Sequence, residues 1–178
     1  MRCQMIDRRK LLTIGGSALV GSALPACVSN NDGFEFHRDT SRRLSSTTRF
    51  DAARFAGQWV IRGEFVHPGQ PPLYGTVAIE HGAKGITGIS ISSGASGRER
   101  YDARMDRAGR ITVGKQPFAT QYWVLWVDAD YRTAAIGTPS GSFGWIIDRN
   151  RKGGDDRIKA AADVMIFNGY AKSRLKLR

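Results

Sequence analysis

The chain has 178 residues, of which 41% are hydrophobic and 24% are charged, and it contains 21 Gly but only two Cys. This length and apolar fraction support one domain with a real core, and they exclude a disordered tail, a disulfide-stapled miniprotein, a collagen and a coiled coil. A net charge of +11, from 27 basic and 16 acidic residues, raises nucleic acid and anionic lipid as candidate partners.

The first 26 residues have the pattern of a secretory signal peptide. Arg8, Arg9 and two further basic residues precede an apolar stretch over 11–24, which as a helix would rise about 21 Å. Because the hydrocarbon core of a bilayer is about 30 Å thick, we expect export rather than a spanning anchor. The arginine pair, ahead of an apolar region diluted by Gly and Ser, resembles a twin-arginine signal, which exports folded cargo.

The signal ends at Leu24-Pro25-Ala26-Cys27, which resembles a bacterial lipobox. In such a motif the cysteine is lipidated and becomes the first residue, so we expect Cys27 to anchor the chain in a bacterial membrane. An incidental thiol is the alternative. Val28 after the cysteine favours the outer membrane, with the protein facing the periplasm. Removal of residues 1–26 leaves 23 basic and 15 acidic residues, a net charge of +8, and one cysteine, which excludes an intrachain disulfide.

Residues 28–49 are rich in Ser, Thr, Asn and Arg and poor in apolar side chains, a composition typical of a flexible tether. A coil of this length has a typical reach of about 25 Å. Its arginines would either rest on anionic headgroups or be solvated. The predicted organisation is a signal peptide over 1–26, a lipidated tether over 27–49 and one domain over 50–178.

From residue 50 to residue 151, short runs of β-branched and aromatic residues alternate with turn residues. Eight such runs predict eight antiparallel strands, a number that closes into a barrel able to hold one small ligand. The expected ranges are 57–65, 74–81, 85–92, 98–106, 110–114, 119–128, 131–138 and 142–149.

One helix is expected after these strands. Asp155 and Asp156 favour its N-terminus through the helix dipole, and Asn168-Gly169 suits its C-terminal stop. Apolar residues at helical spacing between them predict a face that packs on the barrel wall. A last short strand is expected over 171–177.

Two parts of the sequence resemble the lipocalin family. Gly57-Gln58-Trp59 resembles the Gly-x-Trp entry motif, and 122–139 followed by 145–149 resembles the second and third signatures, closest to the bacterial outer-membrane lipoprotein branch. The resemblance covers about 55–178, and its specific part is 122–170. It implies an all-β, eight-stranded up-and-down barrel with one C-terminal helix. It assigns a structural role at the closed end of that barrel to Gly57, Trp59, Asp130, Tyr131 and Arg149.

The expected plug of this closed end is the indole of Trp59. The guanidinium of Arg149 is expected to stack across it, a cation–π contact of roughly 0.5–2 kcal/mol. The competing interpretation makes Asp130 and Arg149 an acid and an electrophile of a catalytic site.

Strand alternation predicts which side chains face the interior. With Trp59 inward, Ile61 and Gly63 follow on the same strand, and the family's usual phase sets the later strands. The lining is therefore apolar and aromatic, with two polar handles, and suits a fatty or isoprenoid chain. Plain core packing is the alternative for each position. The predicted ligand-binding residues are Ile61, Val77, Ile79, Tyr122, Val124, Trp126, Thr133, Ala135, Phe143, Trp145 and Ile147.

The sequence contains no catalytic or metal motif of known spacing, so no catalytic residue, metal or cofactor is predicted. His37, His67 and His81 fall in the tether or in predicted turns. The basic residues are scattered, and no recognition helix or aromatic stripe organises them, which disfavours nucleic acid as a partner.

The predicted function is binding of a small hydrophobic ligand, a fatty acid or a lysophospholipid, for lipid storage, transport or envelope maintenance. The charge of +8 would suit an anionic headgroup at the mouth of the barrel. Two alternatives remain: an enzyme acting on lipid or pigment, which needs an ionisable group such as Glu64 or Asp128 in the cavity, and a ligand-free structural lipoprotein. A cavity below roughly 150 Å³, against the usual 300 Å³ or more, would indicate the structural lipoprotein.

Overall fold

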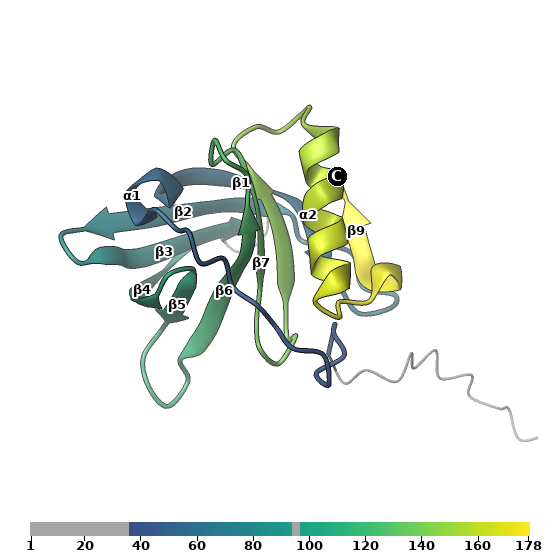
Figure 1. Cartoon of the computed structure of the whole chain (residues 1–178), viewed down its shortest axis with the longest axis horizontal. Helices are drawn as coiled ribbons and strands as arrows, with labels where there is room; N and C mark the ends of the chain where they lie inside the picture. The colour runs from purple at the N-terminus through teal and green to yellow at the C-terminus, as the bar shows by residue number, and fades with distance from the viewer. Residues whose placement is uncertain (1–35, 94–96) are drawn as a thin grey trace, which may run out of the picture. The chain divides into compact units, whose positions relative to one another are not determined.

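The structure is a computed structural model that describes residues 36–93 and 97–178. The predicted signal peptide, Cys27 and the first part of the predicted tether lie outside these described residues. Within them, nine strands are ordered β2-β3-β4-β5-β6-β7-β8-β1-β9, and β1 also pairs with β2. That last pairing closes eight antiparallel strands into a barrel, as predicted (Figure 1).

The strands follow the expected ranges to within two residues, apart from the last one. Residues 171–177 form a single turn of 3₁₀-helix before a strand of three residues, and a short helix before the first strand was not predicted. The elements are α1 (Ala52–Phe55), β1 (Gly57–Phe65), β2 (Gly75–Gly82), β3 (Gly85–Ser93), β4 (Gly97–Arg107), β5 (Arg110–Val113), β6 (Thr120–Val127), β7 (Thr133–Gly137), β8 (Gly144–Asp148), α2 (Asp155–Phe167), η1 (Lys172–Arg174) and β9 (Leu175–Leu177).

The barrel closes through β1, which has three partners along its length. Its first residues pair with β2, with Trp59 opposite Val77, and its middle pairs with β8, with Ile61 opposite Ile147. Its last residues pair with β9. A β-bulge between Ile61 and Gly63 interrupts the register with β8 and increases the local bend of the strand.

The apolar residues form two separate clusters, one inside the barrel and one outside it. The inner cluster contains Trp59 and most isoleucines of the strands, whereas the outer cluster, which includes Ile146, lies between α2 and the strands β6, β7 and β8. Ile158, Ala161, Ala162 and Met165 supply the buried face of α2, as the helical spacing predicted. On β6, β7 and β8, apolar side chains are therefore buried on both faces of the sheet. The strands that α2 does not cover present their outer face to solvent.

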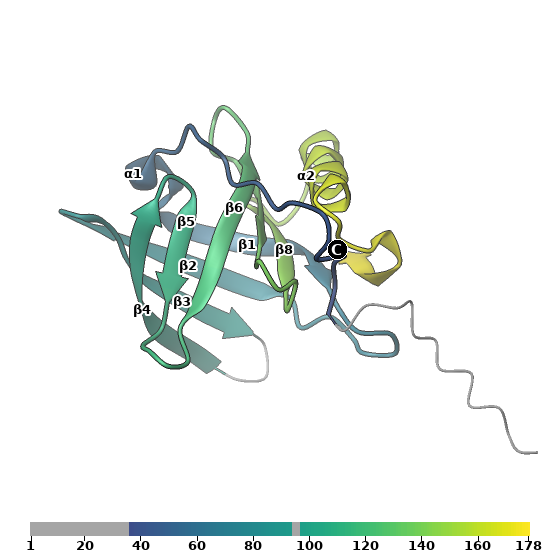
Figure 2. The same cartoon turned by 60° about the horizontal axis from the view of Figure 1, so that its bottom comes forward.

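Residues 36–49 pack on the barrel, which corrects the predicted flexible tether. The Thr47 amide donates to the Val124 carbonyl at 2.8 Å, and the backbone of Arg38 pairs with that of Tyr170 in an isolated antiparallel β-bridge. The buried Arg38 guanidinium donates to carbonyls of Asn168, Pro139 and Arg42. The composition of this segment misleads because it is held by hydrogen bonds rather than by apolar burial. It runs beside β6 from the end of α2 to α1 (Figures 1 and 2).

Candidate ligand-binding site

One end of the barrel is sealed around Trp59. The Arg149 guanidinium carbon lies 3.7 Å from the centroid of its ring, which confirms the predicted stacking contact. The indole N–H donates to the Phe55 carbonyl at 2.8 Å, and the Phe55 ring packs on the indole with centroids 5.2 Å apart. Because Trp59 is fully buried, this end offers no entrance for a ligand.

The hydrogen bonds of Arg149 connect separate segments of the chain at the closed end, as expected for the structural role that the sequence predicted. Its guanidinium donates to the carbonyls of Tyr131, Gln58, Arg54 and Ala56 at 2.8–3.2 Å, and so joins the β6–β7 turn to the segment that enters β1. A guanidinium is suited to this because its donors lie in a fixed plane.

Gly57 and Tyr131 complete the closed end. Gly57 has a φ of +100°, a conformation that favours glycine, and a Cβ there would lie 3.2 Å from Nη1 of Arg149, so that the guanidinium would have to shift. The Tyr131 hydroxyl accepts a hydrogen bond from the Asp51 amide at 2.7 Å. Asp130 is 65% exposed and pairs with Arg132 at 2.9 Å. None of these contacts favours the interpretation of Asp130 and Arg149 as a catalytic acid and electrophile.

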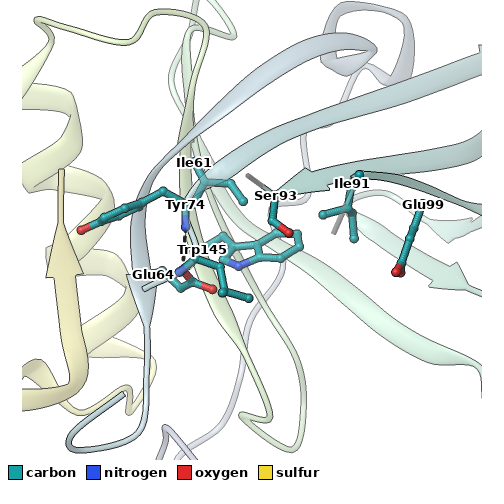
Figure 3. Close-up of a pocket in the computed structure, with 9 residues that line it drawn as sticks. Ile61, Glu64, Tyr74, Ile91, Ser93, Glu99 and Trp145 are labelled. Carbon is teal, nitrogen blue, oxygen red and sulfur yellow. Dashed lines mark hydrogen bonds between the residues drawn. The ribbon is translucent and has the colours of Figure 1, made fainter. Parts of the chain in front are cut away.

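The opposite end is open and holds a cavity of about 210 Å³ (Figure 3). In an antiparallel meander the loops β1–β2, β3–β4, β5–β6 and β7–β8 meet at one end, and the cavity lies where the first two of them join their strands. The residues that line it are Ile61, Glu64, Leu73, Tyr74, Ile91, Ser93, Gly97, Glu99 and Trp145.

Two glutamates give the cavity an acidic character. Glu64 Oε2 accepts hydrogen bonds from the amides of Leu73 and Tyr74, at 2.8 and 3.3 Å, and so holds the end of the β1–β2 loop (Figure 3). The Tyr101 hydroxyl donates to Glu99, and this hydrogen bond raises the pKa of Tyr101. Among the described residues, no Lys or Arg lines the cavity. The lining therefore does not favour the anionic headgroup expected from the net charge.

Aromatic side chains fill part of the open end and limit the cavity. Tyr122 and Phe143 have ring centroids 4.4 Å apart, and Phe143 and Trp145 have centroids 4.8 Å apart. Burial raises the pKa of Tyr122 to about 12, so its hydroxyl stays neutral. The volume of about 210 Å³ lies between the limit set for a solid barrel and the usual size of a ligand pocket.

The predicted ligand-binding residues fall into three groups. Two of them, Ile61 and Trp145, line the cavity. Six more lie in the inner cluster without lining the cavity, and their part in ligand binding stays a prediction: Val77, Ile79, Tyr122, Val124, Phe143 and Ile147. The remaining three, Trp126, Thr133 and Ala135, were predicted to face inward and lie on the outer face instead.

The correction for Trp126 follows from an interruption of strand alternation in β6, whereas Thr133 and Ala135 lie on a regular strand whose phase is opposite to the predicted one. A register shift between Val124 and Trp126 in the β6–β7 pairing places Trp126 with the outer cluster, although Val124 faces inward. On β7, Ala134 faces the inner cluster and Ala135 the outer one. The Thr133 hydroxyl accepts a hydrogen bond from Arg157 of α2 at 2.9 Å, which also marks the outer side.

The bulge in β1 also interrupts strand alternation, and it explains why Glu64 faces the cavity. Gly63 was predicted to face inward, but a Cβ there would meet Leu177 and Ile146 on the outside, at 2.9 and 3.1 Å. The phase change turns the next residue, Glu64, into the cavity. Alternation continued from Ile79 and its partner Ile89 would have found Ile91, which also lines the cavity. Nothing in the sequence pattern indicates the position of the bulge.

The other polar groups singled out in the sequence lie elsewhere. The Asp128 carboxylate accepts from the amides of Arg132 and Thr133, each at 2.6 Å, and so caps the β6–β7 turn. The rings of His37 and His67 contact each other with centroids 4.6 Å apart. Within the described ranges, no group of three or more metal-binding side chains occurs, and no helix is long and apolar enough to cross a membrane.

A second cavity lies on the outer wall, between α2 and β9. It has a volume of about 430 Å³ and a mixed apolar and charged lining. Its lining residues include Arg62, Ile158, Lys159, Ala162, Ile166, Lys172, Leu175 and Leu177. We call this cavity the outer groove.

Comparisons with known proteins agree with this geometry. The family model of the lipocalin-like domain matches residues 94–178. A temperature-induced lipocalin-1 of Arabidopsis thaliana is 37% identical over 59 residues, which are 33% of this chain and 32% of that protein. The match thus spans about a third of the plant protein's length.

Solved structures share the fold at low sequence identity. Insecticyanin of the tobacco hornworm Manduca sexta has a TM-score of 0.59 at 13% identity, over 76% of this chain and 84% of its own. Lipocalin 12 of rat epididymis reaches 0.61 at 15%, over 78% and 91%, and lobster apocrustacyanin A1 reaches 0.51 at 15%, over 70% and 77%. The chain therefore has the lipocalin fold, and the family model supports the lipocalin family.

Proposed function

We propose that this protein is a lipocalin of the bacterial lipoprotein branch that binds one small hydrophobic ligand at the open end of its barrel. The observation that carries the proposal is the cavity of about 210 Å³, which has apolar walls and opens at the end opposite the sealed one. Because pockets for drug-sized ligands usually start at about 300 Å³, we expect the cavity to take part of an acyl chain rather than a whole lipid. The driving force is transfer of that part from water, at about 25 cal/mol per Å² buried.

The charge of the lining indicates which polar end the ligand carries. Glu64 and Glu99 would repel a carboxylate and attract an ammonium or a hydroxyl group. Of the two predicted lipid classes, this favours a lysophospholipid with an amine-bearing headgroup over a fatty acid. The biological use that fits such a ligand is lipid storage, transport or envelope maintenance.

The anchor is the second part of the proposal. The basic start, the short apolar region and the Leu24-Pro25-Ala26-Cys27 motif support export and lipidation of Cys27, with an outer-membrane location favoured by Val28. Expression of the full chain in a Gram-negative bacterium tests this. We expect a membrane-bound product whose first residue is an acylated Cys27, and a soluble one for Cys27→Ser. A soluble parent chain would contradict the anchor.

Ligand binding is tested by filling the cavity. Every contact described for the barrel is made within residues 36–178, so a chain that starts at Val28 keeps what holds the fold. We expect saturable quenching of tryptophan fluorescence on titration with lysophosphatidylethanolamine, and weaker binding of palmitate. Ser93→Trp should abolish binding because Ser93 lines the cavity. Ser92→Trp, on the opposite face of the same strand, is the matched control and should leave binding unchanged.

The two alternatives make different predictions for the same titration. A structural lipoprotein would bind neither lipid, and Ser93→Trp, at a residue that lines the cavity, would change nothing. An enzyme would release a chemically changed lipid, which mass spectrometry of the incubated ligand would detect. The carboxylate to test in that case is Glu64, which faces the cavity.

A further inference from the structure

Three large apolar side chains are exposed at the open end of the barrel. Leu73 in the β1–β2 loop is 66% exposed, Phe118 in the β5–β6 loop is 88% exposed, and Phe167 at the end of α2 is 81% exposed. The two loops lie at the same end because the strands form an antiparallel meander. The end of α2 lies there too, since the Tyr170 hydroxyl contacts the Thr138 amide and the Phe143 carbonyl around the β7–β8 loop.

The described chain also begins at this end. The His37 amide donates to the Gly141 carbonyl in the β7–β8 loop at 2.9 Å, and the His37 ring contacts His67 in the β1–β2 loop. Residue 36, which precedes His37, therefore lies at the rim of the open end. The first described segment begins near the end of α2 (Figure 1). Cys27 precedes Phe36 by nine residues, which span at most about 30 Å when fully extended.

We propose that the open end of the barrel is a membrane-docking surface, in which Leu73, Phe118 and Phe167 enter the interfacial region of an anionic bilayer and the cavity faces that bilayer. Phe and Leu are among the side chains that peripheral membrane proteins bury at the boundary between the headgroups and the acyl chains. Lys115, whose side chain is 86% exposed and pairs with Asp102 at 3.6 Å, lies three residues before Phe118, and the chain without its first 26 residues carries a net charge of +8. Both features complement anionic headgroups.

The packing of residues 36–49 strengthens this orientation. A tether of 22 residues would let the barrel turn freely, whereas the packed segment leaves only residues 28–35 between the proposed anchor and the rim. The anchor would then hold the open end, and not the closed end, within reach of the membrane. This step rests on the proposed lipidation of Cys27, but the exposed apolar side chains do not.

The orientation has a consequence for ligand transfer. Leu73 both lines the cavity and is largely exposed, so it connects the cavity to the docking surface. An acyl chain would pass from the bilayer into the barrel past this side chain without crossing bulk water. The cost of exposing a free acyl chain to water, about 0.8 kcal/mol per CH₂, would thereby be avoided.

The test uses sedimentation of the chain that starts at Val28 with vesicles of phosphatidylcholine and phosphatidylglycerol. We expect binding that Phe118→Ser and Phe167→Ser each weaken roughly tenfold, since each removes one large apolar side chain from the interface. The matched control is Leu177→Ser, because Leu177 is also exposed, at 52%, but lies in the outer groove. Its vesicle binding should equal that of the parent chain, and near-UV circular dichroism should show every variant folded.

Three results would overturn the proposal. The first is a parent chain that binds no vesicles, and the second is a loss on Leu177→Ser that Phe118→Ser does not cause, which would assign docking to the outer groove. The third is a Trp at position 118, from Phe118→Trp, that brominated phosphatidylcholine in the vesicles fails to quench. Binding that is unchanged on vesicles of phosphatidylcholine alone would remove the role of the positive charge.

The failure of this proposal and that of ligand binding are distinguishable. Phe118→Ser does not alter the cavity lining, so it should bind lysophospholipid from solution as the parent does. If the chain binds vesicles but does not bind lysophospholipid from solution, the docking surface is supported and the ligand site is refuted. If the chain binds lysophospholipid but does not bind vesicles, the ligand site is supported and the docking surface is refuted.

Discussion

The two ends of the barrel are built on the same antiparallel strands but differ in the burial and the hydrogen bonding of their side chains. At the closed end, Trp59 is fully buried and Arg149 donates to the carbonyls of several segments. At the open end, Leu73 and Phe118 are exposed and two glutamates line a cavity. The comparison teaches that stability and binding are assigned to opposite ends, so substitutions at each should change one property and spare the other.

The largest expected effect is on the plug of the closed end. Trp59→Ala removes the largest fully buried side chain and leaves a void beside Phe55 and Arg149, which should lower the free energy of unfolding by about 3–5 kcal/mol. Urea denaturation measures this. Trp123→Ala is the control, because that indole is only partly buried on the outer face, where it stacks with Arg110, and we expect a loss of about 1–2 kcal/mol. Equal losses would contradict the role of Trp59 as the plug.

The next effect concerns the hydrogen bonds of Arg149. Arg149→Met keeps apolar contact with the indole of Trp59 but leaves several carbonyls without their donor, and we expect a loss of about 2–3 kcal/mol. Arg149→Lys should recover only part of this, since an ammonium lacks the planar fork. Arg54→Met, which removes a contact at 4.5 Å with the Tyr131 ring, should cost less than about 1 kcal/mol in the same denaturation measurement. A lysine variant as stable as the parent would argue against the fork geometry.

A smaller, pH-dependent effect is expected at the β6–β7 turn. Burial acts to raise the pKa of Asp128, but hydrogen bonds from the amides of Thr133 and Arg132 outweigh it and lower the pKa. A carboxyl whose pKa is depressed in the folded state contributes stability above its unfolded pKa of about 3.9, and this is lost as the pH falls through the folded value. Asp128→Asn should therefore reduce stability by roughly 1 kcal/mol at neutral pH and flatten the loss of stability below about pH 4.

The neighbouring exposed carboxylate provides the control for that measurement. Asp130 pairs with Arg132 at the surface, where an ion pair contributes little, so Asp130→Asn should change stability by less than about 0.5 kcal/mol. Chemical denaturation as a function of pH compares the two variants. Parallel acid profiles for Asp128→Asn and the parent chain would show that the turn does not depend on the charge of Asp128.

Sequence reasoning served the closed end better than the open end, and the reason is physical. The closed end was predicted from the resemblance of Gly57-Gln58-Trp59 and of the stretch that ends at Arg149 to the lipocalin signatures, and the stacking contact at 3.7 Å agrees with that prediction. The strands were also readable, since alternation and turn residues are local signals. What the closed end needs is therefore encoded in short stretches of chain.

The open end depends on features that no local pattern contains. The bulges in β1 and β6 reverse the alternation, so that Glu64 faces inward and Trp126 faces outward. The packing of residues 36–49 was missed because Arg38 is held by carbonyls from distant parts of the chain. The cavity volume depends on how closely Tyr122, Phe143 and Trp145 pack, which is a sum over long-range contacts.

The smallest expected effect tests whether the acidic lining selects the ligand. Glu64→Gln removes one negative charge from the cavity but keeps an oxygen that accepts from the Leu73 amide, so we expect stability within about 0.5 kcal/mol of the parent. Affinity for palmitate should rise by roughly three- to tenfold, because Glu64 repels the carboxylate of palmitate. Affinity for lysophosphatidylethanolamine should fall by a similar factor, because Glu64 attracts the ammonium group of that lipid. Glu80→Gln provides the matched control. Glu80 does not line the cavity and forms an ion pair with Arg100 at a distance of 2.7 Å, so this substitution should leave both affinities unchanged. If palmitate binding does not improve in Glu64→Gln, the ligand's polar end lies outside the reach of this glutamate, and the two lipid classes are then separated by Glu99 or by the bilayer itself.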